Sequence, residues 1–274
     1  MVFDTHVHAY FEQLAEREDD VLRNMDALGV RFAVQIGCDA ESSRKAVALA
    51  KRHPDRYRAT VGLHPGEAQG MEFSRIEQEI REIRTLLETE RDSIVAIGET
   101  GWDFYRLSEN PETATLEKER ERAAFAAQIS LSEEFGLPLV IHTRNSGEAT
   151  LGTIAEFGIR NAVIHCFSED LGFAERAMAL SEGIRFGFSG ILTYKSAKNV
   201  HETARNVPLG RILVETDAPF LAPEPVRGTV NESANVRHVL ERLKTLRPEP
   251  PEEVEKRVWE NSLEFYGLEG KIPE

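Results

Sequence analysis

The sequence has few of the features that mark secreted or membrane-spanning proteins. It contains only two cysteines, Cys38 and Cys166, which are too few for a disulfide framework. No apolar run approaches the roughly 18 residues that suggest a membrane span. The opening segment MVFDTHVHAY has neither the basic region nor the apolar core of a signal peptide. We therefore expect a cytoplasmic protein that does not associate with a membrane.

Positive charge is also scarce. The 33 lysines and arginines are outnumbered by 47 aspartates and glutamates, which gives a net charge of -14. A broad basic surface that grips nucleic acid is excluded, because neutralising phosphates requires clustered lysine and arginine. Any anionic substrate must therefore be held locally. The content of 41% hydrophobic and 29% charged residues is that of an ordinary globular protein with a sizeable core.

Short runs rich in valine, isoleucine and phenylalanine alternate with longer amphipathic segments along the whole chain. The runs that predict strands are residues 2–8, 32–38, 57–64, 94–99, 138–142, 162–167, 184–190 and 211–217. Helices are predicted most clearly at residues 74–90 and 116–136, and two more, 232–247 and 252–266, follow the last strand. This pattern is typical of repeated βα units.

Eight strands that are each followed by a helix can form a closed barrel or an open doubly wound sheet. Open sheets usually have fewer strands and often carry a glycine-rich phosphate turn after the first one. Here the first strand ends in His-Val-His instead. We therefore predict an α/β fold, a (β/α)8 TIM barrel that forms a single domain over residues 1–274, with an extra C-terminal helix.

The first predicted strand carries Asp4, His6 and His8 at every second position. Successive side chains of a strand point to opposite faces, so these three are expected on one face and Phe3 on the other. A lone inward histidine usually packs in the core. Two of them on one inward face favour a shared ligand.

Four other predicted strands carry Glu99, His142, His165 and Asp217 at their C-terminal ends. These ends meet at one mouth of a barrel, so four histidines and two carboxylates would surround one cavity. Burying so many ionisable groups without partners is costly, and a bound cation explains them better. Imidazole and carboxylate ligands suit Mg²⁺, Mn²⁺, Zn²⁺ or Co²⁺. We predict one or two divalent metal ions, which Glu99 could bridge.

The ordered motifs resemble those of the TatD family of metal-dependent deoxyribonucleases, within the wider amidohydrolase-like barrels. The matching segments are DTHVH (4–8), VGLHP (61–65), AIGETGWDF (96–104), PLVIHTR (138–144), VIHCFS (163–168), FSG (188–190), ETDAPFLAP (215–223) and RGTVNE (227–232). The resemblance covers nearly the whole chain, and the order of the segments is more specific than any one of them. The metal ligands that it implies are His6, His8, Glu99, His142, His165 and Asp217. The barrel prediction selects the same six residues independently.

The resemblance also marks His64 as an active-site residue and Asp103, Arg144 and Arg227 as candidate substrate contacts near the mouth. Arg144 follows His142 by two positions, so it is expected on the same inward side, where it could hold a phosphate oxygen. Structural roles are open for all four: a loop cap for His64, a turn for Asp103, a rim ion pair for Arg144 and a loop anchor for Arg227.

Two neighbouring residues have predicted orientations. Cys166 directly follows His165 and is expected to point outward, toward the helices. Glu215 shares the parity of Asp217 and is expected one layer deeper in the barrel, where it could orient a metal ligand.

The resemblance and the ligand set together predict an exonuclease-type deoxyribonuclease, in which a metal-activated water attacks the phosphorus of a DNA phosphodiester. Asp217 would accept the proton, while His64 or Arg144 would hold the phosphate. The expected partner is a DNA end, contacted over a short footprint, and a monomer is compatible with the sequence. The alternatives are an amide, ester or lactone hydrolase with the same metals and a non-catalytic metal-binding protein with a closed coordination shell.

Overall fold

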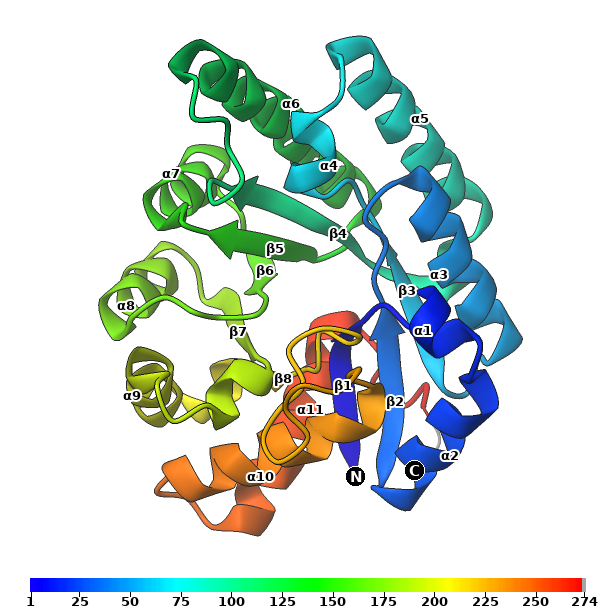
Figure 1. Ribbon diagram of the computed structural model, residues 1–274, viewed down its shortest axis with the longest axis vertical. Coiled ribbons are helices and arrows are strands. Elements are labelled where there is room, and N and C mark those ends of the chain that lie inside the picture. The colour runs from blue at the N-terminus through cyan, green and yellow to red at the C-terminus, as the bar shows by residue number, and fades with distance from the viewer. Residues whose placement is uncertain (273–274) are drawn as a thin grey trace.

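The computed structural model describes residues 1–272 as eight parallel strands surrounded by helices (Figure 1). The strands are β1 (Val2–Val7), β2 (Val30–Gln35), β3 (Tyr57–Val61), β4 (Ile94–Asp103), β5 (Leu139–Arg144), β6 (Asn161–Ile164), β7 (Gly183–Phe188) and β8 (Ile212–Val214). Each strand pairs with the next one along the chain. Between β8 and β1 the barrel closes at a parallel bridge from Val7 to Ala218. The predicted TIM barrel is confirmed.

Helices follow the strands around the barrel. Their bounds are α1 (Glu12–Ala15), α2 (Glu18–Ala27), α3 (Ala40–Arg52), α4 (Pro65–Gln69), α5 (Phe73–Thr89), α6 (Pro111–Phe135), α7 (Gly147–Phe157), α8 (Leu171–Leu180), α9 (Lys198–Asn206), α10 (Val236–Leu246) and α11 (Pro251–Tyr266). The helix α6 begins earlier than predicted because the Asn110 side chain caps it and Pro111 fits its first position. No helix in residues 1–272 combines the length and apolarity needed to cross a bilayer.

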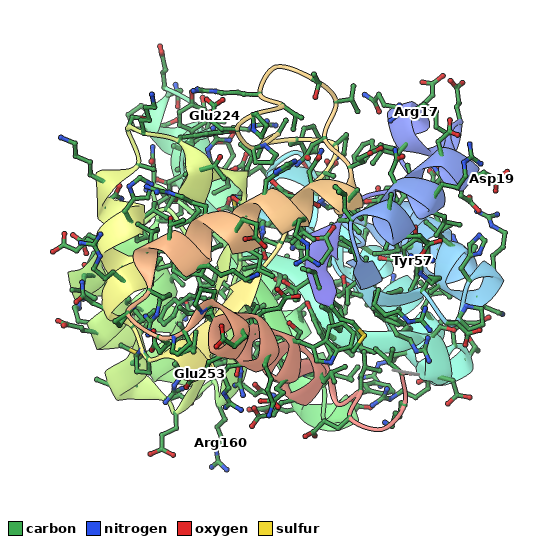
Figure 2. All side chains as sticks on the ribbon, turned by 90° about the horizontal axis from the view of Figure 1, so that it is seen from below. Arg17, Asp19, Tyr57, Arg160, Glu224 and Glu253 are labelled. Carbon is green, nitrogen blue, oxygen red and sulfur yellow. The ribbon has the colours of Figure 1, made fainter. Side chains whose placement is uncertain are left out.

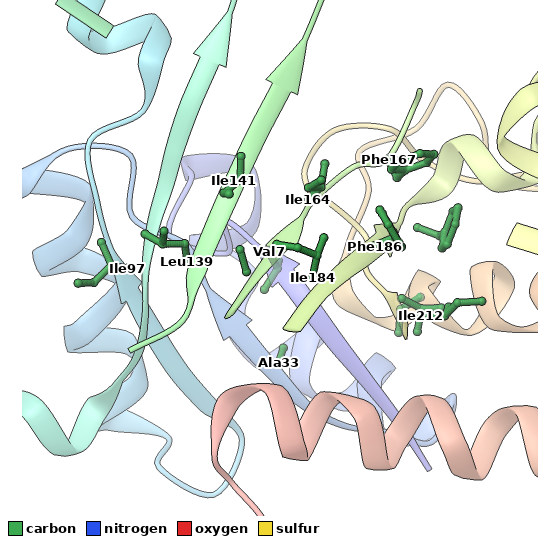
Figure 3. Packing of buried hydrophobic residues seen from close by; sticks show 14 of the residues in the cluster. Val7, Ala33, Ile97, Leu139, Ile141, Ile164, Phe167, Ile184, Phe186 and Ile212 are labelled. Atoms are coloured by element: carbon green, nitrogen blue, oxygen red, sulfur yellow. The ribbon is translucent and has the colours of Figure 1, made fainter. Parts of the chain in front are cut away.

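The strands separate two apolar clusters. Leu139 and Ile141 pack in the larger cluster, which also contains residues of the surrounding helices, whereas Val140 between them packs in the smaller one. Strand residues of the larger cluster labelled in Figure 3 include Ala33, Ile97, Leu139, Ile141, Ile164, Ile184, Phe186 and Ile212. The smaller cluster occupies the barrel interior, where the end of α11 closes it and the Tyr266 hydroxyl donates to the Thr5 carbonyl at 2.8 Å.

Charged side chains cover the exterior of the molecule (Figure 2). Arg160, Glu224 and Glu253 project from the periphery, while Tyr57 lies inside and is 1% exposed. Several ionisable groups are buried, among them His6 and Glu99 at the C-terminal mouth of the barrel. Their burial requires compensating partners.

The predicted strand ends differ from the observed ones at the mouth. The strand β4 continues to Asp103, so Glu99 lies within it and not at its end. The register of β4 against β5 shifts between Ile97 and Thr100, which changes the regular alternation there. The strands β3, β6 and β8 end earlier than predicted, because the segments that follow leave the sheet to line the mouth.

The predicted alternation along β1 is wrong for Asp4 and Phe3. Phe3 packs in the inner cluster, whereas the Asp4 carboxylate accepts hydrogen bonds from the Thr216 backbone at 2.8 Å and the Thr216 hydroxyl at 2.7 Å. The cause is a register shift between Asp4 and Val7, which lets Phe3 and His6 both face the interior. Burial raises the pKa of Asp4 to about 7, and the bonds to Thr216 oppose that rise.

Candidate metal centre

The six predicted ligands meet at the mouth of the barrel in two groups. In the first group, His6 Nε2 lies 3.2 Å from His8 Nε2. Asp217 Oδ1 is 3.6 Å from His6 Nε2 and 3.5 Å from His8 Nε2. The three nitrogen and oxygen atoms therefore face one small space.

The second group contains His142 and His165. Glu99 Oε1 lies 2.8 Å from His142 Nδ1 and 2.7 Å from His165 Nε2, and these two ring nitrogens are 3.1 Å apart. The other oxygen, Glu99 Oε2, is 3.5 Å from His6 Nε2 and 3.9 Å from His8 Nε2. Glu99 thus has one carboxylate oxygen in each group and lies between them.

The donor chemistry of both groups fits a cation. His8 Nδ1 lies 3.1 Å from the Ile36 carbonyl, so a hydrogen on that nitrogen leaves the lone pair of Nε2 directed at His6 Nε2. Carboxylate oxygens of Glu99 and Asp217 face the same space. Electron-pair donors gathered within 4.8 Å of one another repel unless protons or a positive ion separate them. Imidazole and carboxylate sets of this kind suit divalent cations.

Two further carboxylates contact the outer nitrogens of these histidines. Asp103 Oδ2 lies 3.4 Å from His142 Nε2, and Glu215 Oε1 lies 3.5 Å from His165 Nδ1. Glu215 also accepts a hydrogen bond from the Cys166 backbone at 2.5 Å. Neither outer nitrogen is hydrogen-bonded, but each carboxylate charge favours a proton there, which leaves the opposite nitrogen of the ring to act as a ligand.

The pKa values follow from burial and from these neighbours. Burial raises the pKa of Glu99, but the charge of His165 and the hydrogen bonds with His142 and His165 outweigh it and hold that pKa well below its usual range. Burial likewise opposes ionisation of Asp217, whose pKa is nevertheless lowered by the hydrogen bond from His8. Both carboxylates are therefore ionised at neutral pH and available as ligands.

His64 both caps a helix and contacts the cluster. Its Nδ1 accepts a hydrogen bond from Gly66 N at 2.9 Å, at the start of α4. The hydrogen of the neutral ring then resides on Nε2, which lies 3.4 Å from Glu99 Oε1. The loop-capping and active-site interpretations of His64 are therefore compatible.

The two candidate arginines lie at the rim. Arg144 ends β5, is exposed, and its guanidinium stacks over the ring of Tyr105 at 3.8 Å. Arg227 stacks over Tyr194 at 4.3 Å and lies 3.8 Å from Glu224.

Both cysteines lie at the mouth of the barrel. Cys166 has a φ of 46°, so its side chain leaves the strand alternation and its sulfur lies 3.3 Å from the Ser189 hydroxyl. The expectation that it points outward is wrong. Cys38 Sγ lies 3.8 Å from His8 Nδ1 and 4.0 Å from Glu99 Oε2. Cys38 ends the second predicted strand, and this feature of the sequence could have placed it at the mouth of the barrel.

A TIM-barrel mouth that gathers histidines and carboxylates in two groups around a shared glutamate defines the class of metal-dependent hydrolases. The chain belongs to the TatD related DNase family, whose sequence profile matches residues 3–267. It is 32% identical over 270 residues to the uncharacterized metal-dependent hydrolase YabD of Bacillus subtilis, covering 98% of this chain and 100% of that protein.

Two proteins of Escherichia coli are also similar to this chain over nearly its whole length. The uncharacterized metal-dependent hydrolase YcfH is 32% identical over 271 residues, with 97% of this chain and 96% of that protein covered. The crystal structure of the TatD homolog YjjV superimposes with a TM-score of 0.87 at 26% identity, covering 97% of this chain and 98% of that one. The likeness therefore extends over the whole barrel.

Proposed function

We propose that the protein is an exonuclease-type deoxyribonuclease that acts on DNA ends in the cytoplasm. The observation that carries the proposal is Glu99, whose Oε2 faces the group of His6, His8 and Asp217 and whose Oε1 faces His142 and His165. The two groups adjoin, because ligand atoms of His6, Glu99 and His165 also lie within 4.8 Å of one another. Glu99 would contribute to the binding of a cation in each group, and two cations held there would supply the positive charge that phosphodiester hydrolysis needs at the attacking and leaving oxygens. Membership of the TatD related DNase family supports DNA as the substrate.

The proposed ligands divide between the two groups. His6, His8 and Asp217 would hold one cation, His142 and His165 the other, with Glu99 shared. Divalent cations such as Mg²⁺, Mn²⁺, Zn²⁺ or Co²⁺ supply a Lewis acid that lowers the pKa of water and offsets phosphate charge.

The remaining chemistry belongs to the side chains of the mouth. The Asp217 side chain is 15% exposed and that of Glu99 is 5% exposed, so Asp217 is the more accessible acceptor for the proton of the attacking water. His64, with 20% of its side chain exposed and its Nε2 hydrogen at the edge of the cluster, can donate to a phosphate oxygen. Arg144 and Arg227 at the rim would contact phosphates further along the strand.

Replacing the proton acceptor tests this function. We expect Asp217→Asn to lower the rate of cleavage of end-labelled DNA by about 10²- to 10⁴-fold with each of Mg²⁺, Mn²⁺, Co²⁺ and Zn²⁺. The circular dichroism spectrum should remain that of the native barrel. Asp19→Asn, which changes an exposed carboxylate on α2, is the matched control and should cleave normally. An Asp217→Asn protein with native activity would contradict the proposed role.

A second candidate is hydrolysis of an amide, ester or lactone with the same ligands. The net charge of -14 favours it, because a neutral substrate avoids long-range repulsion. The same purified protein, loaded with metal, is assayed against a panel of small esters, lactones and amides. Turnover of those compounds without cleavage of DNA would replace the first proposal by this one.

A further inference from the structure

Two phenylalanines are exposed beside the metal centre. Phe220 is 51% exposed and Phe11 is 36% exposed. Both rings contact the ligand histidine His8, with ring centroids 5.7 Å from it for Phe11 and 6.4 Å for Phe220. Single exposed apolar side chains need no explanation, but two in mutual contact beside a polar centre mark a binding surface.

The two rings form a corner. The centroids of Phe11 and Phe220 are 5.8 Å apart and their planes are 73° from each other. Tyr10 stacks against Phe11 at 5.2 Å and 23°. One ring can therefore offer its face to a flat ligand while the other contacts the ligand edge.

The backbone fixes this corner relative to the proposed proton acceptor. Phe220 N donates to the Asp217 carbonyl at 2.9 Å, and the Phe220 carbonyl accepts from Asn231 Nδ2 at 2.7 Å. Asn231 is fully buried and also donates to the Thr216 carbonyl at 3.0 Å. A ligand held by Phe220 is therefore positioned relative to Asp217.

The charge of the protein indicates what occupies the corner. With a net charge of -14, phosphate contacts alone offer little affinity for DNA. Arg144 and Arg227, which stack on Tyr105 and Tyr194, are the rim arginines proposed to contact phosphates further along the strand. Stacking of a base on an aromatic ring is independent of phosphate charge and accepts every base.

We propose that Phe11 and Phe220 form a stacking subsite for the nucleobase next to the scissile phosphate. The inference rests on the proposed deoxyribonuclease function and deepens it. A base in this corner has left the stack of its own strand, so the substrate is a DNA end whose terminal base is unpaired.

The test compares intact and abasic substrates. End-labelled single-stranded oligonucleotides carry either a normal terminal nucleotide or a tetrahydrofuran abasic one, at each terminus in separate substrates. For the terminus that is cleaved, we expect the abasic substrate to raise KM of the native protein about tenfold, with a smaller change in kcat. This comparison uses only the native protein and does not depend on the folding of a variant.

Substitutions of Phe11 and Phe220 then test whether these two rings cause the difference in KM between the abasic and intact substrates. In the double variant Phe11→Leu with Phe220→Leu, the ratio of abasic to intact KM should fall to about one. Phe73→Leu, at an exposed phenylalanine that begins α5, is the matched control and should keep the native ratio.

The possible results distinguish a failure of the stacking subsite from a failure of the proposed deoxyribonuclease function. Cleavage of DNA with equal KM for the two substrates, or a tenfold ratio that persists in the double variant, would overturn the stacking subsite and leave the deoxyribonuclease standing. A native protein that cleaves no DNA with any of the four cations would overturn both.

Discussion

Glu99 has one carboxylate oxygen facing each group of ligand atoms, so its two oxygens are not equivalent. A glutamine at this position would turn an amide NH₂ toward the nitrogens of one group and leave only one oxygen as a ligand. The identity of this side chain therefore decides whether one cation or two can be held.

The contact between Glu215 and His165 can be tested by mutation. Its carboxylate faces the outer nitrogen of His165 at 3.5 Å, and glutamine keeps its volume while removing its charge. We expect Glu215→Gln to weaken binding of Mn²⁺ or Zn²⁺ by about 10- to 100-fold, because the orientation and basicity of His165 depend on it. Isothermal titration calorimetry measures the change, and Glu148→Gln, an exposed glutamate on α7, is the control. Unchanged affinity would show that Glu215 does not position His165.

The sequence could predict that the six candidate ligands gather at one mouth, because spacing by two and strand ends are both local patterns. Asp4 and Cys166 were assigned the wrong direction for a common reason. A register shift in β1 and a positive φ at Cys166 each interrupt the alternation of side chains. These interruptions are set by packing around the closed barrel and have no signature in one sequence.

At the level of helices and strands, α5 and α11 lie within one residue of their predicted ranges, because amphipathic periodicity spans many residues. Helix starts were predicted less well elsewhere, since α6 begins five residues before and α10 four residues after the predicted position. Glu255 of α11 links three elements, since it contacts Lys244 and Arg237 of α10 and the amino group of Met1. This single side chain therefore ties the start of the chain to its last two helices.

The Glu255 contacts predict a pH-dependent contribution to stability. Burial opposes ionisation, but Lys244, the amino terminus and Arg237 outweigh it and lower the pKa of Glu255 from 4.5 to about 2. Because the folded-state pKa lies below the unfolded-state value, the stabilisation is complete above pH 4.5 and is lost as the pH falls toward 2. We expect Glu255→Gln to lower the free energy of unfolding by about 1 kcal/mol at neutral pH, after allowance for solvent screening.

Urea denaturation of the native protein and of Glu255→Gln measures this difference. The two free energies should converge as the pH falls from 4.5 toward 2. Glu253→Gln, on the same helix but projecting from the periphery, should match the native protein throughout. A difference that stays constant with pH would contradict the electrostatic explanation.

At the scale of the whole molecule, the acidic exterior limits how DNA can bind. Arginines and lysines on the surface are largely paired with glutamates and aspartates, as for Arg84 with Glu134 and Arg176 with Glu148. Little positive charge remains to follow a phosphate backbone away from the mouth. Affinity should therefore come from the nucleotides nearest the cleaved bond.

This limit predicts that the length of the DNA substrate has little influence on KM. We expect KM for single-stranded oligonucleotides of about 10 and about 40 nucleotides to agree within a factor of about three. The slope of log affinity against log salt should be that of one or two phosphate contacts, about -0.7 to -1.4 for single strands. A gel shift showing tight binding that increases with length would contradict the proposed short footprint.

We propose that side chains in or just after five strands of the barrel hold two divalent cations with Glu99 between them. Anomalous diffraction from crystals grown with Mn²⁺ or Zn²⁺ would locate these ions. We expect two anomalous peaks, one against His6, His8 and Asp217 and the other against His142 and His165, each within ligand distance of Glu99. Crystals saturated with metal that show no peak at the mouth of the barrel would contradict it.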